Sequence, residues 1–304
     1  MRRVLIVVVL IVGAAILGLW RSQGGVRQGL TRAVGASDQN EPGVTGDETR
    51  KTFELKPGTR VTIQGINGKV EVQTSDTQTA EVLVRRNGNN PASLRRRELT
   101  IEQTSEGLLI RSKQSHVGFW DHLFGRDPRE EVIIKAPRQI ALTLKGINGA
   151  ISTSDIDGPL EVKGVNGKIE LGETSGSAEI SGVNGRISIG LKSLDDRGAR
   201  VSGVNGGIEL RLGNGLNADL TATGMNGNVR SEIAEVTVNK EDYGRNFSAR
   251  IGTGGVPITI SGINGNVRLT RGESTAASGD KKPAMTEKAE KSATEAKPAK
   301  GSEK

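Results

Sequence analysis

Few residues in this chain have the types and spacing that chemistry requires. The sequence of 304 residues has two histidines and no cysteine, so a thiol nucleophile, a disulfide framework and a cysteine-linked lipid anchor are excluded. Both histidines, His116 and His122, lie in one short stretch that lacks the spaced carboxylates or cysteines of a metal-ligand set. We expect neither a metal nor a cofactor.

Four aspartates, which fall mostly in expected turns, are the remaining candidates for acid–base chemistry. They are Asp155, Asp157, Asp195 and Asp196. A polysaccharide-cleaving β-helical enzyme would need such carboxylates to converge with a base or a bound metal on one face. The stretch from Gly146 to Val267 contains no histidine and no cysteine to complete such a group. We therefore expect a protein that is not an enzyme.

The dominant feature of the sequence is a phrase of glycine, an apolar residue, asparagine, glycine, any residue and a β-branched residue. It occurs seven times, with its asparagines at Asn67, Asn148, Asn166, Asn184, Asn205, Asn226 and Asn264. From Asn148 onward it returns at a period of about twenty residues, which is the signature of a repeat architecture. The last interval is close to two periods, so we expect residues 231–257 to form an imperfect coil. The gap after Asn67 would hold about four degenerate coils.

The apolar residues that flank the phrase show that the chain changes direction within it. One aliphatic residue stands two positions before the first glycine and another stands two positions after the second. An uninterrupted strand would send these two residues to opposite faces. A corner at Asn-Gly removes the conflict, because asparagine tolerates the left-handed region and glycine enters it without steric cost.

Two architectures use such a corner. In an antiparallel meander of β-hairpins, Asn-Gly would form a two-residue type I′ turn. In a β-solenoid, the corners stack about 4.8 Å apart and the asparagine amides hydrogen-bond to one another as a ladder. The ladder explains why the same asparagine returns at nearly every period. We therefore favour an all-β repeat solenoid, similar to a parallel β-helix, with the antiparallel hairpin meander as the alternative.

The composition agrees with a solenoid. The chain has 42 glycines and only 2% aromatic residues, so small aliphatic side chains must fill a thin interior. The net charge is +7, but basic and acidic residues are interleaved without a basic stripe and aromatic partners, which argues against nucleic-acid binding. We expect the run from Arg95 to Arg97 to be a solvated turn.

Both ends of the chain differ from the repeats. The uncharged run from Val4 to Trp20 is long enough for a short transmembrane helix, with a cleaved signal peptide as the competing interpretation. We divide the chain into a membrane anchor at 1–20, a flexible stalk at 21–50, a β-repeat domain at 51–271 and a disordered tail rich in Lys, Glu and Ala at 272–304.

An aromatic insertion, residues 115–127, interrupts the β-repeat domain. It holds Phe119, Trp120 and Phe124 together with both histidines. One interpretation is a hydrophobic plug, because solenoids need capped ends. Contact with a partner or a membrane is the second interpretation, and a metal site is the third.

The repeated phrase resembles a bacterial adhesin-type family of unknown function, also called the toastrack domain. The resemblance includes the step Ala136-Pro137-Arg138 before the apolar run Ile140 to Leu144, and the single upstream copy at Gly65. The chain is similar as well to the autotransporter-adhesin head domains that are named for their Gly-Ile-Asn motif. The resemblance covers residues 50–270 and implies a β-helical domain in a bacterial envelope protein, in some members linked to envelope stress. It implies no catalytic residue.

These observations predict a single-pass protein of the bacterial cell membrane whose β-domain is extracytoplasmic, either periplasmic or at the cell surface. Its partners would be the membrane, through Val4 to Trp20, and an envelope protein or a glycan. We expect the solenoid to be an adhesin-like binding or scaffolding module. The alternatives are a membrane-bound regulator of an envelope-stress pathway and a self-associating structural β-helix.

Overall fold

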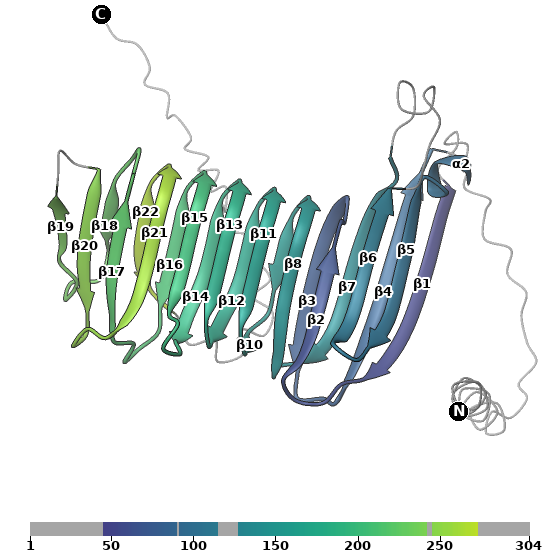
Figure 1. Ribbon diagram of the computed structural model, residues 1–304, viewed down its shortest axis with the longest axis horizontal. Helices are drawn as coiled ribbons and strands as arrows, with labels where there is room; N and C mark the ends of the chain where they lie inside the picture. Colours follow the sequence, from purple (N-terminus) through teal and green to yellow (C-terminus); the bar gives the residue numbers. More distant parts are fainter. Residues whose placement is uncertain (1–44, 90, 115–126, 242–244, 273–304) are drawn as a thin grey trace, which may run out of the picture. The chain divides into compact units, whose positions relative to one another are not determined.

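The computed structural model describes residues 45–89, 91–114, 127–241 and 245–272, which form the β-body of Figure 1. No helix among these residues is long and apolar enough to cross a membrane, and the run from Val4 to Trp20 lies outside them. The aromatic residues Phe119, Trp120 and Phe124 and nearly all of the expected tail also lie outside them.

Two sheets of eleven strands each make up the β-body. Sheet A contains, in spatial order, β1 (Thr45–Glu54), β4 (Thr79–Gly88), β7 (Arg129–Pro137), β3 (Gly68–Ser75), β9 (Ile151–Thr153), β12 (Ile169–Ser175), β14 (Ile187–Ser193), β16 (Ile208–Leu212), β22 (Val267–Arg271) and β18 (Val229–Ser231), with β10 (Ile156–Asp157) beside β12. Sheet B contains β19 (Val238–Glu241), β20 (Asn246–Ile251), β17 (Ala218–Thr223), β21 (Val256–Asn264), β15 (Ala199–Asn205), β13 (Ala178–Asn184), β11 (Leu160–Asn166), β8 (Ile140–Asn148), β2 (Thr59–Gln64), β6 (Gly107–Gln114) and β5 (Arg97–Thr104). A short helix, α2 (Pro91–Leu94), joins β4 to β5.

The repeats form a solenoid-like stack. Each coil runs through one strand of sheet B and then one strand of sheet A, as in β11 followed by β12 and β13 followed by β14. Neighbouring copies pair in parallel, with each asparagine beside the next, as for Asn166 and Asn184. The expected all-β fold is confirmed. The hairpin meander is wrong for the repeats, because its neighbouring strands would be antiparallel.

The two glycines of the phrase serve different purposes. At the first, Gly146 has φ of +61° and forms a bulge, so that Lys145 and Gly146 both lie outward between the buried Leu144 and Ile147. The second glycine, Gly149, lies against the neighbouring coil, where a Cβ atom would be 2.1 Å from the carbonyl oxygen of Gly68. The bulge at the first glycine turns the next aliphatic residue, Ile147, into the core. The close approach of the second glycine to the neighbouring coil lets the corners stack.

One aliphatic core runs through the β-body between the two sheets. It extends from Leu55 to Leu269, and its inward residues alternate along the strands up to the bulge, as Leu160 and Val162 do in β11, with Val165 turned inward after it. Phe247 is the only aromatic side chain among the buried apolar residues of the described part of the chain. Each fully buried aliphatic side chain contributes about 1.5–3 kcal/mol, so the stack is stabilised by many similar increments.

The order of coils in space is not their order in sequence. The coil of β21 and β22 lies between the coil of β15 and β16 and that of β17 and β18. Beyond β17, β20 and β19 are antiparallel. The expected imperfect coil at 231–257 is therefore wrong, because these residues form an antiparallel end and the return path to β21.

The opposite end is also antiparallel. β2 and β3, which carry the first phrase, stack directly on β8 and β9. The intervening residues contribute one coil, β6 and β7, and beyond it the antiparallel strands β5 and β4. β1, which precedes the first phrase, pairs with β4 in the antiparallel sense. The expectation of about four degenerate coils in this gap is therefore wrong, since most of the chain there closes the end of the stack.

Candidate binding surfaces

The asparagines of the phrase form a continuous hydrogen-bonded series along one edge of the stack. Each side-chain amide nitrogen donates to the side-chain oxygen of the next residue, at 2.9–3.3 Å, in the order Asn226, Asn264, Asn205, Asn184, Asn166, Asn148 and Asn67. The amide nitrogen of Asn67 donates to the carbonyl oxygen of Pro128 at 3.2 Å. Because each amide within the series uses a donor and an acceptor for its neighbours, this edge is built for cohesion between coils.

A buried ion pair lies where the asparagine series ends. The Glu130 carboxylate, which is 2% exposed as a residue, accepts the backbone N–H of Asn67 at 2.9 Å and the hydroxyl of Ser112. The Arg97 guanidinium lies 3.4 Å from the same carboxylate and 3.6 Å from Asp127. The expected solvated turn is thus wrong for Arg97, whose side chain is only 11% exposed. Sequence spacing gave no signal for this pair, because its partners come from different strands.

The aspartates considered for catalysis lie on two separate connections. Asp155 follows β9, and its carboxylate accepts the N–H of Glu173 at 2.8 Å and lies 3.4 Å from Arg138. Asp195 follows β14, and its carboxylate accepts both the backbone N–H of Arg197 at 2.9 Å and the guanidinium at 2.8 Å. The Arg197 side chain, opposed by partial burial, holds the pKa of Asp195 below its usual range. These two carboxylates hold turns together.

The described residues contain no cluster of three or more His, Cys, Asp or Glu side chains that could hold a metal ion. The two histidines, His116 and His122, lie outside the described residues.

The outer face of sheet A is less open than the sequence suggests. Alternation along the repeats predicts outward rows that contain Lys168, Glu170, Arg186, Ser188, Glu209 and Arg211. Ser188 is only 8% exposed, because Arg211 lies over it and donates to its hydroxyl oxygen at 2.6 Å. The same guanidinium donates to the carbonyl oxygen of Leu171 at 2.5 Å, beside a register shift between β12 and β14. Arg211 therefore covers an irregularity of the sheet.

The outer face of sheet B has a charged half. Glu161 lies 3.3 Å from Lys145 and 2.8 Å from Lys163, and Lys163 lies 3.1 Å from Glu179. Burial opposes ionisation of Glu161, but its hydrogen bonds to Lys163 and Lys145 prevail and hold its pKa below the usual range. These charges are paired with one another across adjacent coils.

The other half of this face carries hydroxyl side chains in register. Pairing of β13, β15, β21 and β17 aligns two outward rows, Ser181, Ser202, Ser261 and Thr223 in one and Thr259 and Thr221 in the other. All six residues are partly or fully exposed, and their hydroxyls make no hydrogen bond to other described residues. In the second row the positions on β13 and β15 are Glu179 and Arg200, so free hydroxyls cross four strands in the first row and two strands in the second.

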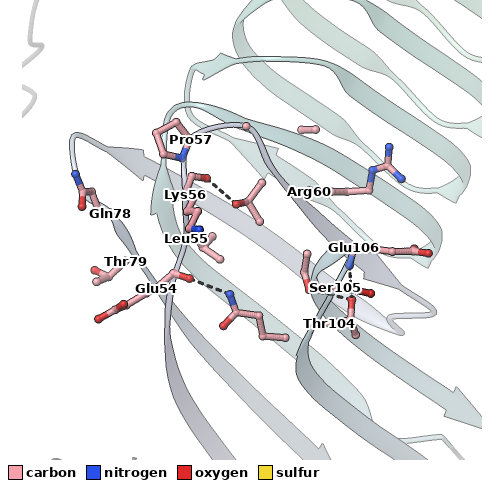
Figure 2. A pocket seen from close by; sticks show the side chains of 15 residues that line it. Glu54, Leu55, Lys56, Pro57, Arg60, Gln78, Thr79, Thr104, Ser105 and Glu106 are labelled. Carbon is pink, nitrogen blue, oxygen red and sulfur yellow. Dashed lines mark hydrogen bonds between the residues drawn. The ribbon is translucent and has the colours of Figure 1, made fainter. Parts of the chain in front are cut away.

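A groove of about 1130 Å³ opens where β1 turns into β2 (Figure 2). The turns from β3 to β4 and from β5 to β6 complete its walls. Across it, the Gln103 side-chain amide donates to the carbonyl oxygen of Glu54 at 3.0 Å. Within the turn from β1 to β2, the Thr59 hydroxyl donates to the carbonyl oxygen of Lys56 at 2.6 Å. Its lining mixes polar and apolar residues and carries charges of both signs, from Glu54, Lys56, Arg60 and Glu106.

Comparison with known proteins gives structural neighbours alone. No protein-family model and no curated protein matches the chain. A putative cell adhesion protein from Clostridium sporogenes is similar in structure, at 12% identity over 75% of this chain and 100% of that one, with a TM-score of 0.40. A putative adhesin from Bacteroides fragilis is 9% identical over 73% and 97% of the two chains, with a TM-score of 0.29. A putative lipid binding protein from Parabacteroides distasonis is 12% identical over 74% and 97%, with a TM-score of 0.23. Two of these three neighbours are named as adhesion proteins and one as a lipid binding protein.

Proposed function

We propose that this chain is a non-catalytic binding module of the bacterial envelope, and that the hydroxyl half of sheet B contacts an extended, repetitive glycan. The observation that carries the proposal is the alignment of Ser181, Ser202, Ser261 and Thr223 across four neighbouring strands. Neighbouring strands lie about 4.8 Å apart, so the hydroxyls recur at a fixed spacing along the axis of the stack.

Chemical complementarity supports a glycan as the partner. A serine or threonine hydroxyl both donates and accepts, as a sugar hydroxyl does, so either orientation of the polymer finds partners. The strands that carry the rows are fixed by the core beneath them, where Ile180, Val201 and Ile260 are at most 3% exposed. A rigid surface pays little ordering entropy on binding, so many weak hydrogen bonds can add to a useful affinity.

An envelope location remains an expectation that rests on the run from Val4 to Trp20 and on the family resemblance. Under it, the apolar run holds the protein at the membrane and leaves the β-body to reach the glycan outside the cytoplasm. A module of this kind would need neither metal nor cofactor.

The test is cosedimentation of the protein with insoluble bacterial cell-wall glycan. We expect the unchanged protein to sediment with the glycan and Ser202→Lys to lose at least tenfold in affinity, because a long cation interrupts the row of hydroxyls. Ser152→Lys is the matched control, since Ser152 lies on the outer face of sheet A and is also partly exposed. Equal loss in both variants, or no sedimentation of the unchanged protein, would contradict the proposal.

A further inference from the structure

The two sheets end unevenly beyond the coil of β6 and β7. Sheet A continues with β4 and then β1, whereas sheet B continues with β5 alone. In Figure 1, β1 is the last strand at the purple end of the β-body. With β5 opposite β4, no described strand of sheet B faces β1. Among the residues that the structure describes, the strand position beside β5 therefore has no occupant.

The free edge of β5 carries backbone groups that side chains partly cover. In the antiparallel pair of β5 and β6, every second residue directs its N–H and C=O away from the partner strand. Two of the outward carbonyls are capped from sheet A: Lys51 Nζ donates to the oxygen of Ile101 at 2.9 Å, and an Arg86 Nη atom donates to that of Arg97 at 3.1 Å. The edge is thus held by two cations and by no backbone partner.

Two open grooves follow this strand position. One, of about 450 Å³, is lined by alternate residues of β1 and by the free edge of β5, including Asp47, Thr49, Lys51, Leu99 and Ile101. The other is the groove of Figure 2, lined further along the same strands by Glu54, Leu55, Gln103 and Thr104. We call the two grooves together the β5 slot.

The smaller groove of the β5 slot has more cations than carboxylates in its lining. Four cations stand against two carboxylates: Lys51, Arg86, Arg95 and Arg97 against Asp47 and Glu98. Arg86 is already paired with Asp47, and Arg97 is already paired with Glu130 and Asp127. Among the described residues of this groove, that leaves Lys51 and Arg95 against Glu98. Cations on an edge strand keep apolar strands from adding to a sheet, but the same cations attract a strand that carries carboxylates.

We propose that the β5 slot binds an extended acidic peptide segment of a partner protein, which adds to sheet B as a strand beside β5. Only an extended backbone supplies both the donors and the acceptors that a strand edge lacks. On binding, a peptide N–H replaces Lys51 at the carbonyl oxygen of Ile101, and the released ammonium pairs with a peptide carboxylate. A second copy of β5 fits this position poorly, because its own free-edge residues bring Arg97 and no carboxylate.

The test uses the full chain and two labelled peptides as long as β5, eight residues. One alternates glutamate and threonine, and the other alternates lysine and threonine. Fluorescence anisotropy measures binding, and amide hydrogen exchange locates it. We expect the glutamate peptide to bind at least tenfold more tightly than the lysine peptide and to slow exchange of the Leu99 and Ile101 amides.

A charge reversal separates binding from structural damage. Lys51→Glu should lose the glutamate peptide and gain affinity for the lysine peptide, a reversal that unfolding cannot produce. Lys135→Glu is the control, because Lys135 is 62% exposed and pairs with Glu81 on the outer face of sheet A. The proposal is overturned if both peptides bind alike or not at all, or if protection falls outside β5. It is also overturned if β5 becomes protected with rising protein concentration and no peptide, which would assign the slot to a second copy.

Discussion

The side-chain amide of Asn264 donates to the side-chain oxygen of Asn205 at 3.0 Å, because the two residues lie in neighbouring coils although they are 59 positions apart in the sequence. Asn226, which comes between them in sequence, lies on the far side of Asn264. The asparagine series is therefore a property of the stacked coils and does not follow the order of the chain.

Loss of one amide from the series should weaken the stack. In Asn184→Ala the amides of Asn166 and Asn205 each lose a partner. Each hydrogen bond contributes about 0.5–1.5 kcal/mol to stability. We therefore expect the free energy of unfolding, measured by thermal or urea unfolding, to fall by about 1–3 kcal/mol. Ser152→Ala is the control, because this partly exposed side chain makes no such bond to the described residues and lies outside the proposed glycan surface. An unchanged melting temperature in Asn184→Ala, with loss of partner binding, would show that the asparagine is a contact residue instead.

The two glycines of one phrase should respond differently to substitution by alanine. At Gly182, φ is +63° and the nearest atom to an added Cβ is 3.6 Å away, so Gly182→Ala should cost about 1–2 kcal/mol for the left-handed conformation. At Gly185 an added Cβ would lie 2.1 Å from the carbonyl oxygen of Gly167, which is backbone and cannot move alone. We expect Gly185→Ala to lower the melting temperature at least twice as much. Equal effects would mean that the coils are less tightly stacked than the structure indicates.

Breaking the buried ion pair of Arg97 and Glu130 should strongly lower the free energy of unfolding. Arg97→Met leaves the fully buried Glu130 side chain without its cation, a situation that typically costs about 3–5 kcal/mol. The double variant Arg97→Met with Glu130→Gln should recover part of the loss, because no buried charge remains. Lys135→Met, which breaks an exposed pair, should cost less than about 1 kcal/mol. A single-variant loss no larger than this control would contradict burial of the pair.

Acid should remove the contribution of Asp195 to stability. Its pKa is lowered from the ordinary value of 3.8, chiefly by the side-chain hydrogen bond from Arg197, so the ionised form stabilises the folded state. That contribution is fully present above pH 3.8, the ordinary pKa, and is lost as the pH falls through the lower pKa that Asp195 has in the folded state. We expect Asp195→Asn to melt below the unchanged protein at pH 7 and the difference to shrink below pH 3.8. A difference that does not depend on pH would contradict the assignment, and Asp196→Asn is the neighbouring control.

Much of the repeat could be predicted from the sequence because its physics is local. The parity of the aliphatic residues around each phrase requires a corner, and a recurring asparagine at the corner favours stacking over hairpins. The strand from Leu160 to Asn166 and its neighbour from Ala178 to Asn184 show this outcome, in parallel and in register. The prediction missed one local detail, the bulge at the first glycine, which turns Val165 as well as Val162 into the core.

The ends and the candidate surfaces depended on tertiary structure. Near-identical phrases can stack on one another in any order, so no local signal places Asn264 between Asn205 and Asn226. The burial of Arg97 against Glu130 and the cover of Arg211 over Ser188 arise between strands distant in sequence, where side-chain type alone predicts exposure. By itself the sequence determined the period, the corner and the aliphatic interior. Only the tertiary structure decided which coils are neighbours, which charges are buried and where the described residues leave the position beside β5 without a strand, because those depend on non-local pairing.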